Sequence, residues 1–306
     1  MLATEERSTT ASRCIEFDGD LVRRKLNRDW FAVEHHLSSH PLFSLPRLVE
    51  LAKTTAVQRP EFLHFDVGAK SVAQRWDETP SSQWPVDETI RRVQDAGAWI
   101  VIRRANEDPD YGRLLNQCMD ELLEHADPEL ERKIKIREVI IFITSPNRLS
   151  TYHIDRECNF LLQISGEKML YVFDRNDREV LPQTEIERFW SVDHNAAVYK
   201  PEFQDRAYPF LLKPGNGLHI PINCPHWLQN SNNISISLSV NFQFRESVAG
   251  NLYRANYFLR RMGITPSEPG QSSVRDALKT GIFTGIKGAI DATPDGVKDV
   301  VKRVLR

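Results

Sequence analysis

Residues 150–177 read STYHIDRECNFLLQISGEKMLYVFDRND, which places two apolar runs on either side of a short polar turn. The runs NFLLQI (159–164) and KMLYVF (168–173) are short, apolar and bounded by turn residues, which is typical of buried strands. A His-Ile-Asp motif at residues 153–155 precedes the first run. The segment therefore predicts two strands joined by a turn, with a histidine and a carboxylate close to where the first strand begins.

The same pattern continues on both sides, over residues 135 to 245. Short runs rich in Val, Ile and Phe (EVIIFIT, PFLLK, GLHIP and NISISLSVNFQF) are separated by turn clusters such as SPN, DRND, KPGNG and NSNN. Many short strands of this kind predict an all-β barrel or sandwich. In the last run one face carries Ile234, Ile236, Leu238, Val240, Phe242 and Phe244, and the other carries Ser235, Ser237, Ser239, Asn241 and Gln243. A face of small polar side chains leaves room for a ligand.

Helical patterns flank this central region. We expect residues 1–134 to form a helical N-terminal region that packs on the barrel of residues 135–245, and residues 246–306 to form C-terminal helices. The expected helices cover 45–55 with Ser44 as N-cap, 85–96 ended by Gly97, 111–126, 274–290 with Ser273 as N-cap, and 295–306 after Thr293 and Pro294. A short apolar strand is expected at 99–104.

Composition narrows the class of protein. Of 306 residues, 41 % are hydrophobic and 27 % charged, which is typical of a globular domain. Lys and Arg total 40 against 42 Asp and Glu, so we expect no nucleic-acid partner. There is no apolar run of membrane-spanning length and no signal-peptide pattern, and the four cysteines are scattered. We therefore expect a cytoplasmic protein with buried free thiols and no membrane span.

His153, Asp155 and the later His226 form the candidate metal site. Residues at i and i+2 on a strand end point the same way, so His153 and Asp155 can reach one metal, and His226 comes from a later strand. Two imidazoles and one carboxylate on one face of a metal suit non-haem Fe(II), because co-substrate and oxygen can then bind together. An HxD motif also occurs by chance, and a histidine on a strand is often structural.

Two segments of the chain resemble the JmjC/cupin-like oxygenases, and they are especially similar to the asparaginyl hydroxylase of the hypoxia pathway and its bacterial relatives. They are residues 150–177 and PGNGLHIPINCPHWLQN (214–230), in which a Gly-rich turn and an apolar IP strand precede the distal ligand histidine. NFQF (241–244) resembles the closing strand. The resemblance covers about residues 135 to 245. It implies a mainly β fold with flanking helices, built on a double-stranded β-helix of the jelly-roll or cupin type.

The resemblance also implies site residues and co-substrates. His153, Asp155 and His226 would bind Fe(II), and 2-oxoglutarate would be the co-substrate. Lys168 matches the lysine that pairs with the distal carboxylate of 2-oxoglutarate, although taken alone it would be interpreted as a solvated turn lysine. Ser150 matches a hydroxyl that binds the same carboxylate. The other matches are amides that line the co-substrate pocket, at Asn159 and Asn241.

The expected activity is hydroxylation of a peptide or protein side chain or of a natural product, and a small metabolite also remains open as substrate. Cys224 and Pro225 precede His226 where relatives often carry aromatic residues, and Gln243 stands where some protein hydroxylases have an aromatic residue near the substrate. These departures leave the substrate class open. The alternatives are a non-catalytic cupin that binds a ligand and another metal-dependent cupin enzyme such as an isomerase.

Other motifs carry weaker interpretations. His219 either contacts the metal-site residues or faces away from them, and His35, His36 and His40 are expected in surface or packing roles. Two C-terminal apolar stripes comprise Val274, Ala277, Leu278, Ile282 and Ile286, then Val297, Val300, Val301 and Val304. They predict packing on the barrel or on a second copy in a homodimer. A membrane-surface role is the alternative for the basic residues Lys298, Lys302, Arg303 and Arg306.

Overall fold

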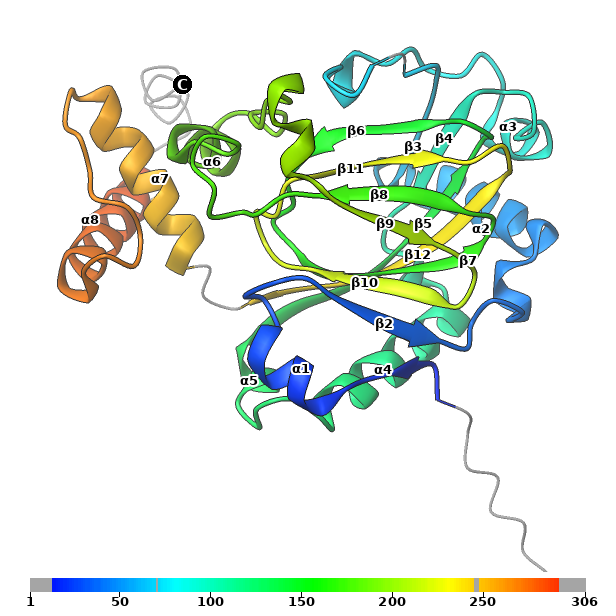
Figure 1. Ribbon diagram of the computed structural model, residues 1–306, viewed down its shortest axis with the longest axis horizontal. Coiled ribbons are helices and arrows are strands. Elements are labelled where there is room, and N and C mark those ends of the chain that lie inside the picture. The colour runs from blue at the N-terminus through cyan, green and yellow to red at the C-terminus, as the bar shows by residue number, and fades with distance from the viewer. Residues whose placement is uncertain (1–12, 70, 245–247, 292–306) are drawn as a thin grey trace, which may run out of the picture.

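The computed structural model describes residues 13–69, 71–244 and 248–291, and its centre is a double-stranded β-helix (Figure 1). From β5 to β12 the strands alternate between a large and a small sheet, except that β8 and β9 both lie in the small one, and every neighbouring pair is antiparallel. The strands of the barrel are β5 (Ile134–Thr144), β6 (Leu149–His153), β7 (Cys158–Ser165), β8 (Lys168–Val172), β9 (Tyr208–Leu212), β10 (Asn216–Ile220), β11 (His226–Asn230) and β12 (Ser235–Phe244). The large sheet contains the order β10-β7-β12-β5 and the small sheet has the order β6-β11-β8-β9. This jelly-roll arrangement confirms the expected fold class.

The N-terminal region adds strands to both edges of the large sheet. β2 (Phe31–His35) pairs with β10 and β1 (Ile15–Glu16) with β2, while β4 (Ala98–Ile102) pairs with β5 and β3 (Leu63–Val67) with β4. The expectation of a helical N-terminal region is therefore only partly confirmed. Strands such as FAVEH alternate buried and exposed residues over so few positions that their pattern is hard to tell from that of a loop.

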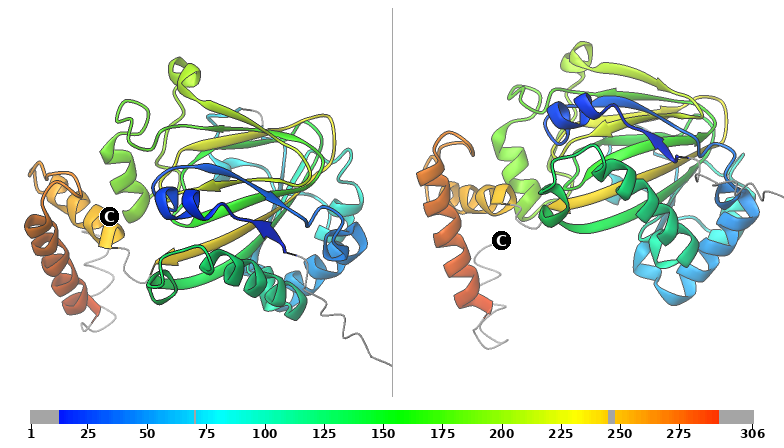
Figure 2. Two further views of the ribbon diagram at one scale, coloured as in Figure 1. Left: turned by 60° about the horizontal axis from the view of Figure 1, so that its bottom comes forward. Right: turned by 90° about the horizontal axis from the view of Figure 1, so that it is seen from below.

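Helices cover the outer face of the large sheet (Figure 2). They are α1 (Gly19–Lys25), α2 (Leu45–Gln58), α3 (Val86–Arg91), α4 (Pro109–Leu123) and α5 (Leu130–Lys133). The short 3-10 turns are η1 (Pro41–Phe43), η2 (Pro60–Phe62), η3 (Trp76–Glu78), η4 (Ala105–Glu107) and η5 (Pro201–Arg206), of which η5 packs on the small sheet. One core cluster joins buried side chains of α2, α3 and α4 to Ile236, Leu238, Val240 and Phe242 of β12. The apolar face of β12 thus lies under the helices, and its polar face points into the barrel.

Helix ends follow local capping. Ser44 is the N-cap of α2, as expected, although its side chain makes no capping hydrogen bond. α4 begins two residues earlier than the pattern indicates, because Asp108 accepts a hydrogen bond from the backbone N of Asp110 (3.0 Å) and Pro109 suits the first turn. In the C-terminal helix α8 (Ser273–Asp291), Ser272 rather than Ser273 is the cap, since its Oγ accepts from the backbone N of Arg275 (3.4 Å).

Three helices lie at the end of the barrel toward which β6 runs (Figure 1). α7 (Val248–Arg261) packs on α6 (Gln183–Ser191), with Arg260 Nε donating to Glu187 Oε2 at 2.6 Å, and α8 packs on α7. On α8 the apolar side chains of Val274, Leu278 and Ile282 are exposed, so they do not pack on the barrel.

Some C-terminal expectations lie outside the described residues. They are the second apolar stripe, the helix after Thr293 and Pro294, the basic residues near the end of the chain, and the side chain of Ile286. Within the described part, no helix is both long and apolar enough to cross a membrane. All four cysteines are buried free thiols, as the sequence predicts.

Two buried histidines join the strands of the large sheet as neutral rings. His35 Nε2 donates to the carbonyl of Gln163 (2.9 Å), while its Nδ1 accepts from the backbone N of Leu37 (3.1 Å). His219 Nδ1 donates to the carbonyl of Asn159 (2.9 Å), while its Nε2 accepts from the backbone N of Asn27 (3.0 Å). Burial lowers the pKa of His35 to about 4 and that of His219 to about 3.

The His219 ring packs against Phe31 and Phe160, on the face of the sheet away from the barrel interior. Of the two interpretations of this histidine, the structure therefore supports the one in which it faces away from the metal site. It touches the site indirectly, through the backbone of Asn159.

We predict a loss of stability in mild acid. A histidine whose pKa is depressed by folding contributes stability above its unfolded pKa of 6.5, and that contribution is lost as the pH falls toward the folded value. Between about pH 6.5 and pH 5 each of His35 and His219 should cost about 1–2 kcal/mol of unfolding free energy. Denaturant unfolding at several pH values measures how the unfolding free energy depends on pH. This dependence should be weaker in His35→Gln than in the wild type and unchanged in the exposed His36→Gln. An unchanged slope for His35→Gln would contradict this account.

Candidate metal centre

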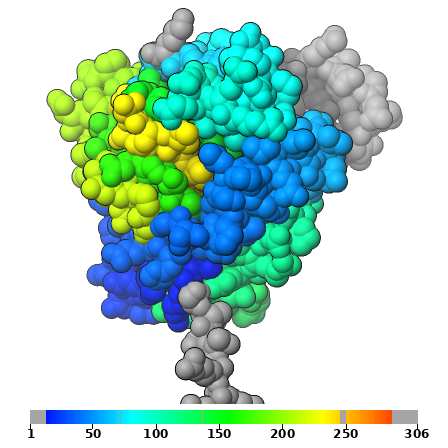
Figure 3. All heavy atoms as spheres, turned by 90° about the vertical axis from the view of Figure 1, so that its right-hand side faces the viewer, coloured from blue at the N-terminus to red at the C-terminus, as the bar shows by residue number. Residues whose placement is uncertain are grey.

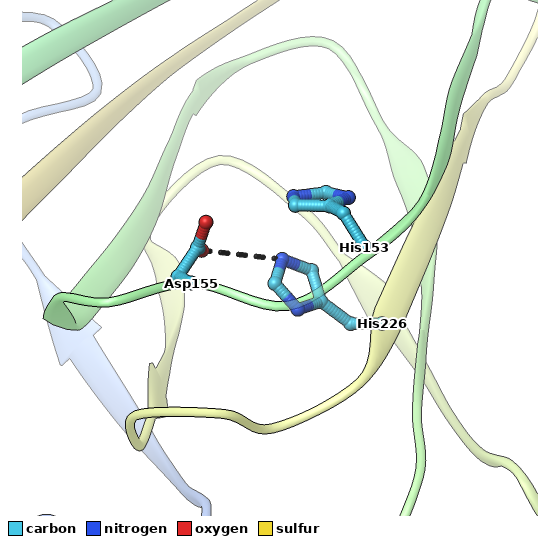
Figure 4. Close-up of side chains that lie close together, drawn as sticks. All are labelled: His153, Asp155 and His226. Carbon is cyan, nitrogen blue, oxygen red and sulfur yellow. Dashed lines mark ion pairs between the residues drawn. The ribbon is translucent and has the colours of Figure 1, made fainter. Parts of the chain in front are cut away.

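His153, Asp155 and His226 meet at one end of the barrel (Figure 4). His153 ends β6 and His226 begins β11, and the two residues are paired directly across these strands. Their ring centroids are 4.2 Å apart, and His226 Nε2 lies 3.7 Å from Asp155 Oδ2. One potential ligand atom from each side chain lies within 4.8 Å of the others. This spacing allows a single metal ion to be bound by all three.

Backbone carbonyls fix both imidazole rings. His153 Nδ1 donates to the carbonyl of Thr151 (2.6 Å), and His226 Nδ1 donates to that of Cys224 (2.9 Å). Each ring therefore carries its proton on Nδ1 and keeps the Nε2 lone pair for a metal, as metal-binding histidines do. Burial, together with the neighbouring His153, lowers the pKa of His226 to about 4, so this ring is neutral near pH 7.

Two hydrogen bonds hold Asp155, one at its carboxylate and one at its backbone carbonyl. Asn159 Nδ2 donates to its Oδ2 at 3.4 Å, and the backbone N of Asn223 donates to the Asp155 carbonyl at 2.9 Å. Asn223 has a left-handed backbone (φ 58°), which brings its N–H back toward the turn after β6. The donor set of two imidazoles and an oriented carboxylate fits a divalent transition metal.

A bulge in β6 turns Ser150 toward the same side as His153. His153 pairs with His226 and Ser150 pairs with Leu228, so β6 uses one more residue than β11 over this interval. Strict alternation would place Ser150 and His153 on opposite faces, and the extra residue removes that conflict. Both side chains consequently line the interior of the barrel.

A cavity of about 710 Å³ connects the metal centre to the interior. The residues assigned to the site from the sequence all line it: His153, Asp155, His226, Lys168, Ser150, Asn159 and Asn241. The polar face of β12 contributes Ser239, Asn241 and Gln243, as its alternation predicts. Asn241 bonds within its own strand, with Nδ2 donating to the Ser239 carbonyl at 3.1 Å. The structure thus brings the predicted residues into one cavity, and their individual roles remain proposals.

Lys168 is the first residue of β8 and is 4 % exposed. Its ammonium group makes no hydrogen bond or ion pair with any residue that the structure describes, and burial lowers its pKa to about 7. A buried cation without a partner is costly. Lys168 is therefore not the solvated turn lysine that its position in the sequence alone would indicate.

Sequence reasoning missed several charged groups that line the cavity, and Arg148 and Glu157 are two of them. Arg148 is buried and forms an ion pair with Asp66 of β3. Glu157 accepts a hydrogen bond from Gln243 Nε2 (2.6 Å), and burial raises the pKa of its carboxyl group. Arg148 lies two residues before Ser150, just ahead of β6, which is the only signal in the sequence, because its partner Asp66 belongs to a distant segment.

Comparison with solved structures identifies the class of fold. The chain is similar to the ribosomal oxygenase YcfD from Escherichia coli, with 13 % identity over 92 % of this chain and 68 % of that one, and a TM-score of 0.52. It also matches YcfD in complex with cobalt and succinic acid (14 % identity, 93 % and 69 % coverage, TM-score 0.51) and with cobalt and 2-oxoglutarate (14 % identity, 89 % and 67 % coverage, TM-score 0.50). At this identity the likeness establishes a shared fold. Neither a protein-family model nor a curated protein matches the sequence.

We predict that Asp155→Ala and His153→Ala lose metal affinity while the barrel stays folded. Losing one of three ligands should weaken Mn(II) or Co(II) binding by more than about a hundredfold, since even partners of ligands are worth tenfold to a hundredfold. Calorimetry measures the affinity and circular dichroism the fold. His194→Ala is the matched control, because His194 lines the same cavity outside the metal cluster and should leave binding unchanged. Near wild-type affinity in either ligand variant would refute the metal assignment.

Proposed function

We propose that this protein is an Fe(II)- and 2-oxoglutarate-dependent oxygenase. The observation that carries the proposal is the pairing of two features in one cavity. A cluster of two histidines and a carboxylate lies at one end, and the buried, unpartnered cation Lys168 lines the same cavity. A ligand that chelates a metal through one end and carries an anionic group at the other would bind to the metal cluster and to Lys168 at the same time.

The same pairing favours an oxygenase over the alternatives. A non-catalytic binding module has no need of a preorganised metal cluster beside an unpaired cation. An isomerase of the metal-cupin type usually uses more histidine ligands, whereas the described residues gather two histidines and one aspartate here. The shared fold with YcfD, whose structures include cobalt with 2-oxoglutarate, supports the same choice.

When bound, iron would supply the activation of oxygen with 2-oxoglutarate as co-substrate. One oxygen atom of O2 would convert a substrate C–H to C–OH and the other would enter succinate, with carbon dioxide released from 2-oxoglutarate. The protein holds the iron through His153, Asp155 and His226. Lys168 and Ser150 bind the distal carboxylate of 2-oxoglutarate and thereby fix its orientation. Asn159 keeps the Asp155 carboxylate turned toward the metal.

We infer a peptide or protein side chain as the substrate. The cavity is also lined by residues of the N-terminal region and of α6, including Trp76, Trp99, Arg103 and Phe189. Aromatic and charged side chains together suit a polypeptide segment with mixed polarity. YcfD is described as a ribosomal oxygenase, which supports a protein substrate for this chain as well.

The homodimer and the cytoplasmic location stay predictions. The exposed stripe of Val274, Leu278 and Ile282 on α8 supports a contact with a second copy, because exposed apolar side chains in a row commonly mark an interface.

Turnover of the intact chain tests the proposed function. With Fe(II), 2-oxoglutarate, oxygen and candidate peptides, we expect succinate to form and one peptide to gain the mass of one oxygen atom. Asp155→Ala should abolish both signals. If the wild-type chain binds neither a divalent metal nor 2-oxoglutarate, the oxygenase proposal is wrong and the non-catalytic binding module becomes the better interpretation.

The buried lysine predicts a pH-dependent affinity for 2-oxoglutarate. Below its pKa of about 7, Lys168 is charged and ready to bind an anion, whereas above it the lysine must first take up a proton. The dissociation constant should therefore rise by up to roughly tenfold per pH unit above 7. In Lys168→Arg the side chain stays charged, so the dissociation constant should depend less on pH. The different reach of arginine should also change the affinity itself.

Lys168→Ala should weaken 2-oxoglutarate binding by about two to three orders of magnitude, because removing one partner of a buried charge pair costs about 3–5 kcal/mol. Calorimetry of the Mn(II)-loaded chain at about pH 6, 7 and 8.5 measures both effects. Equal affinity in wild type and Lys168→Ala would remove the anchor assignment, and a wild-type affinity independent of pH would contradict the proton uptake.

A further inference from the structure

Arg148 and Lys168 lie at the same level of the small sheet. The backbone N of Asn230 in β11 donates to the carbonyl of Arg148 (3.0 Å), and on its other side Asn230 pairs in register with Lys168 of β8. The two cations therefore flank one residue of the central strand. His226 pairs with Val172, four residues beyond Lys168 along β8, which places this level roughly 13 Å from the metal end.

The Arg148 side chain points into the cavity. It lies two residues before Ser150, just ahead of β6, and both side chains line the interior. Arg148 is 6 % exposed, and the blue and cyan N-terminal segments pack beside the green and yellow strand connections at this end of the molecule (Figure 3). The guanidinium is thus held inside the barrel rather than in solvent.

Only part of the guanidinium has a partner. One nitrogen, Nη2, forms the ion pair with Asp66, whereas Nε and Nη1 are buried and have no hydrogen-bond partner among the residues that the structure describes. Asp66 is itself fixed, because Thr79 Oγ1 donates to its Oδ2 at 2.5 Å and His64 Nε2 lies 3.4 Å from the same oxygen. Buried donors without acceptors cost free energy, so these two nitrogens mark a place for a ligand acceptor.

The charged groups at this end have a net charge that one anion would neutralise. Lys168 and Arg148 contribute two positive charges, and Asp66 contributes one negative charge. Burial lowers the pKa of both cations, and Asp66 partly opposes this for Arg148. A single carboxylate between them would bring the group to neutrality and supply acceptors for the unpaired donors.

We propose that Arg148 is a second anion-binding residue of the co-substrate site, so that the distal carboxylate is held between Arg148 and Lys168. Asp66 positions Arg148, which makes β3 of the N-terminal region part of this site. The inference rests on the proposed function, because it concerns the far end of 2-oxoglutarate. It adds a residue that neither the sequence motif nor the lysine alone supplies.

The test compares two ligands on the Mn(II)-loaded full chain. 2-Oxopentanoate has the same five-carbon chain and chelating end as 2-oxoglutarate but lacks the distal carboxylate. Arg148→Gln should weaken 2-oxoglutarate binding about tenfold to a hundredfold, since charge-assisted hydrogen bonds are lost, and should change 2-oxopentanoate affinity little. Arg47→Gln is the matched control: this arginine also forms an ion pair with an aspartate, Asp108, but does not line the cavity, and should leave both affinities unchanged.

Each other outcome overturns the inference in a distinguishable way. If Arg148→Gln weakens both ligands equally, the residue is a structural clamp for Asp66. If Lys168→Ala loses 2-oxoglutarate while Arg148→Gln does not, Lys168 alone anchors the carboxylate and the proposed function survives. A wild-type chain that fails to bind 2-oxoglutarate overturns both.

Circular dichroism establishes whether Arg148→Gln is folded. If it is not, Arg148→Lys carries the test, because it keeps the charge but not the planar guanidinium. It should then weaken 2-oxoglutarate several-fold and leave 2-oxopentanoate unchanged, and equal loss for the two ligands would overturn the inference.

Discussion

The antiparallel pairing of β6 with β11 is the constraint on which the site depends. It puts His153 opposite His226 and, through one extra residue in β6, puts Ser150 on the same side. A shift of the register by one residue would turn one histidine out of the barrel and scatter the ligands. The register is held because β11 also pairs with β8, so the strand that carries His226 is fixed on both edges.

The two faces of the large sheet have different tasks. Its outer face packs against α2, α3 and α4 in a continuous apolar core, which supplies the burial that stabilises the fold. Its inner face carries amides and hydroxyls toward a cavity that also contains two buried cations. Polar and charged groups that are buried there without full pairing reduce the stability of the fold. The burial of apolar side chains in the outer core must offset this free-energy cost.

Much of the barrel and the metal site follows from the sequence. The alternation in β12 predicts both its apolar and its polar face, and the HxD motif with a later histidine predicts the cluster that the structure brings together. The edge strands β1 to β3 escape prediction because they are short and lack a long apolar run. The bulge in β6 and the contact between Arg148 and Asp66 escape it because pairing register and distant neighbours are set by the whole fold, not by local pattern.

The imidazoles of the metal centre are oriented by carbonyls only two residues before each of them, at Thr151 and Cys224. Their orientation is thus encoded within the two short segments that carry the ligands, independently of the walls of the cavity. During evolution, residues around the mouth can be exchanged without turning the rings away from the metal. In a barrel built in this way, the residues at the rim can change while the orientation of the two imidazoles is kept.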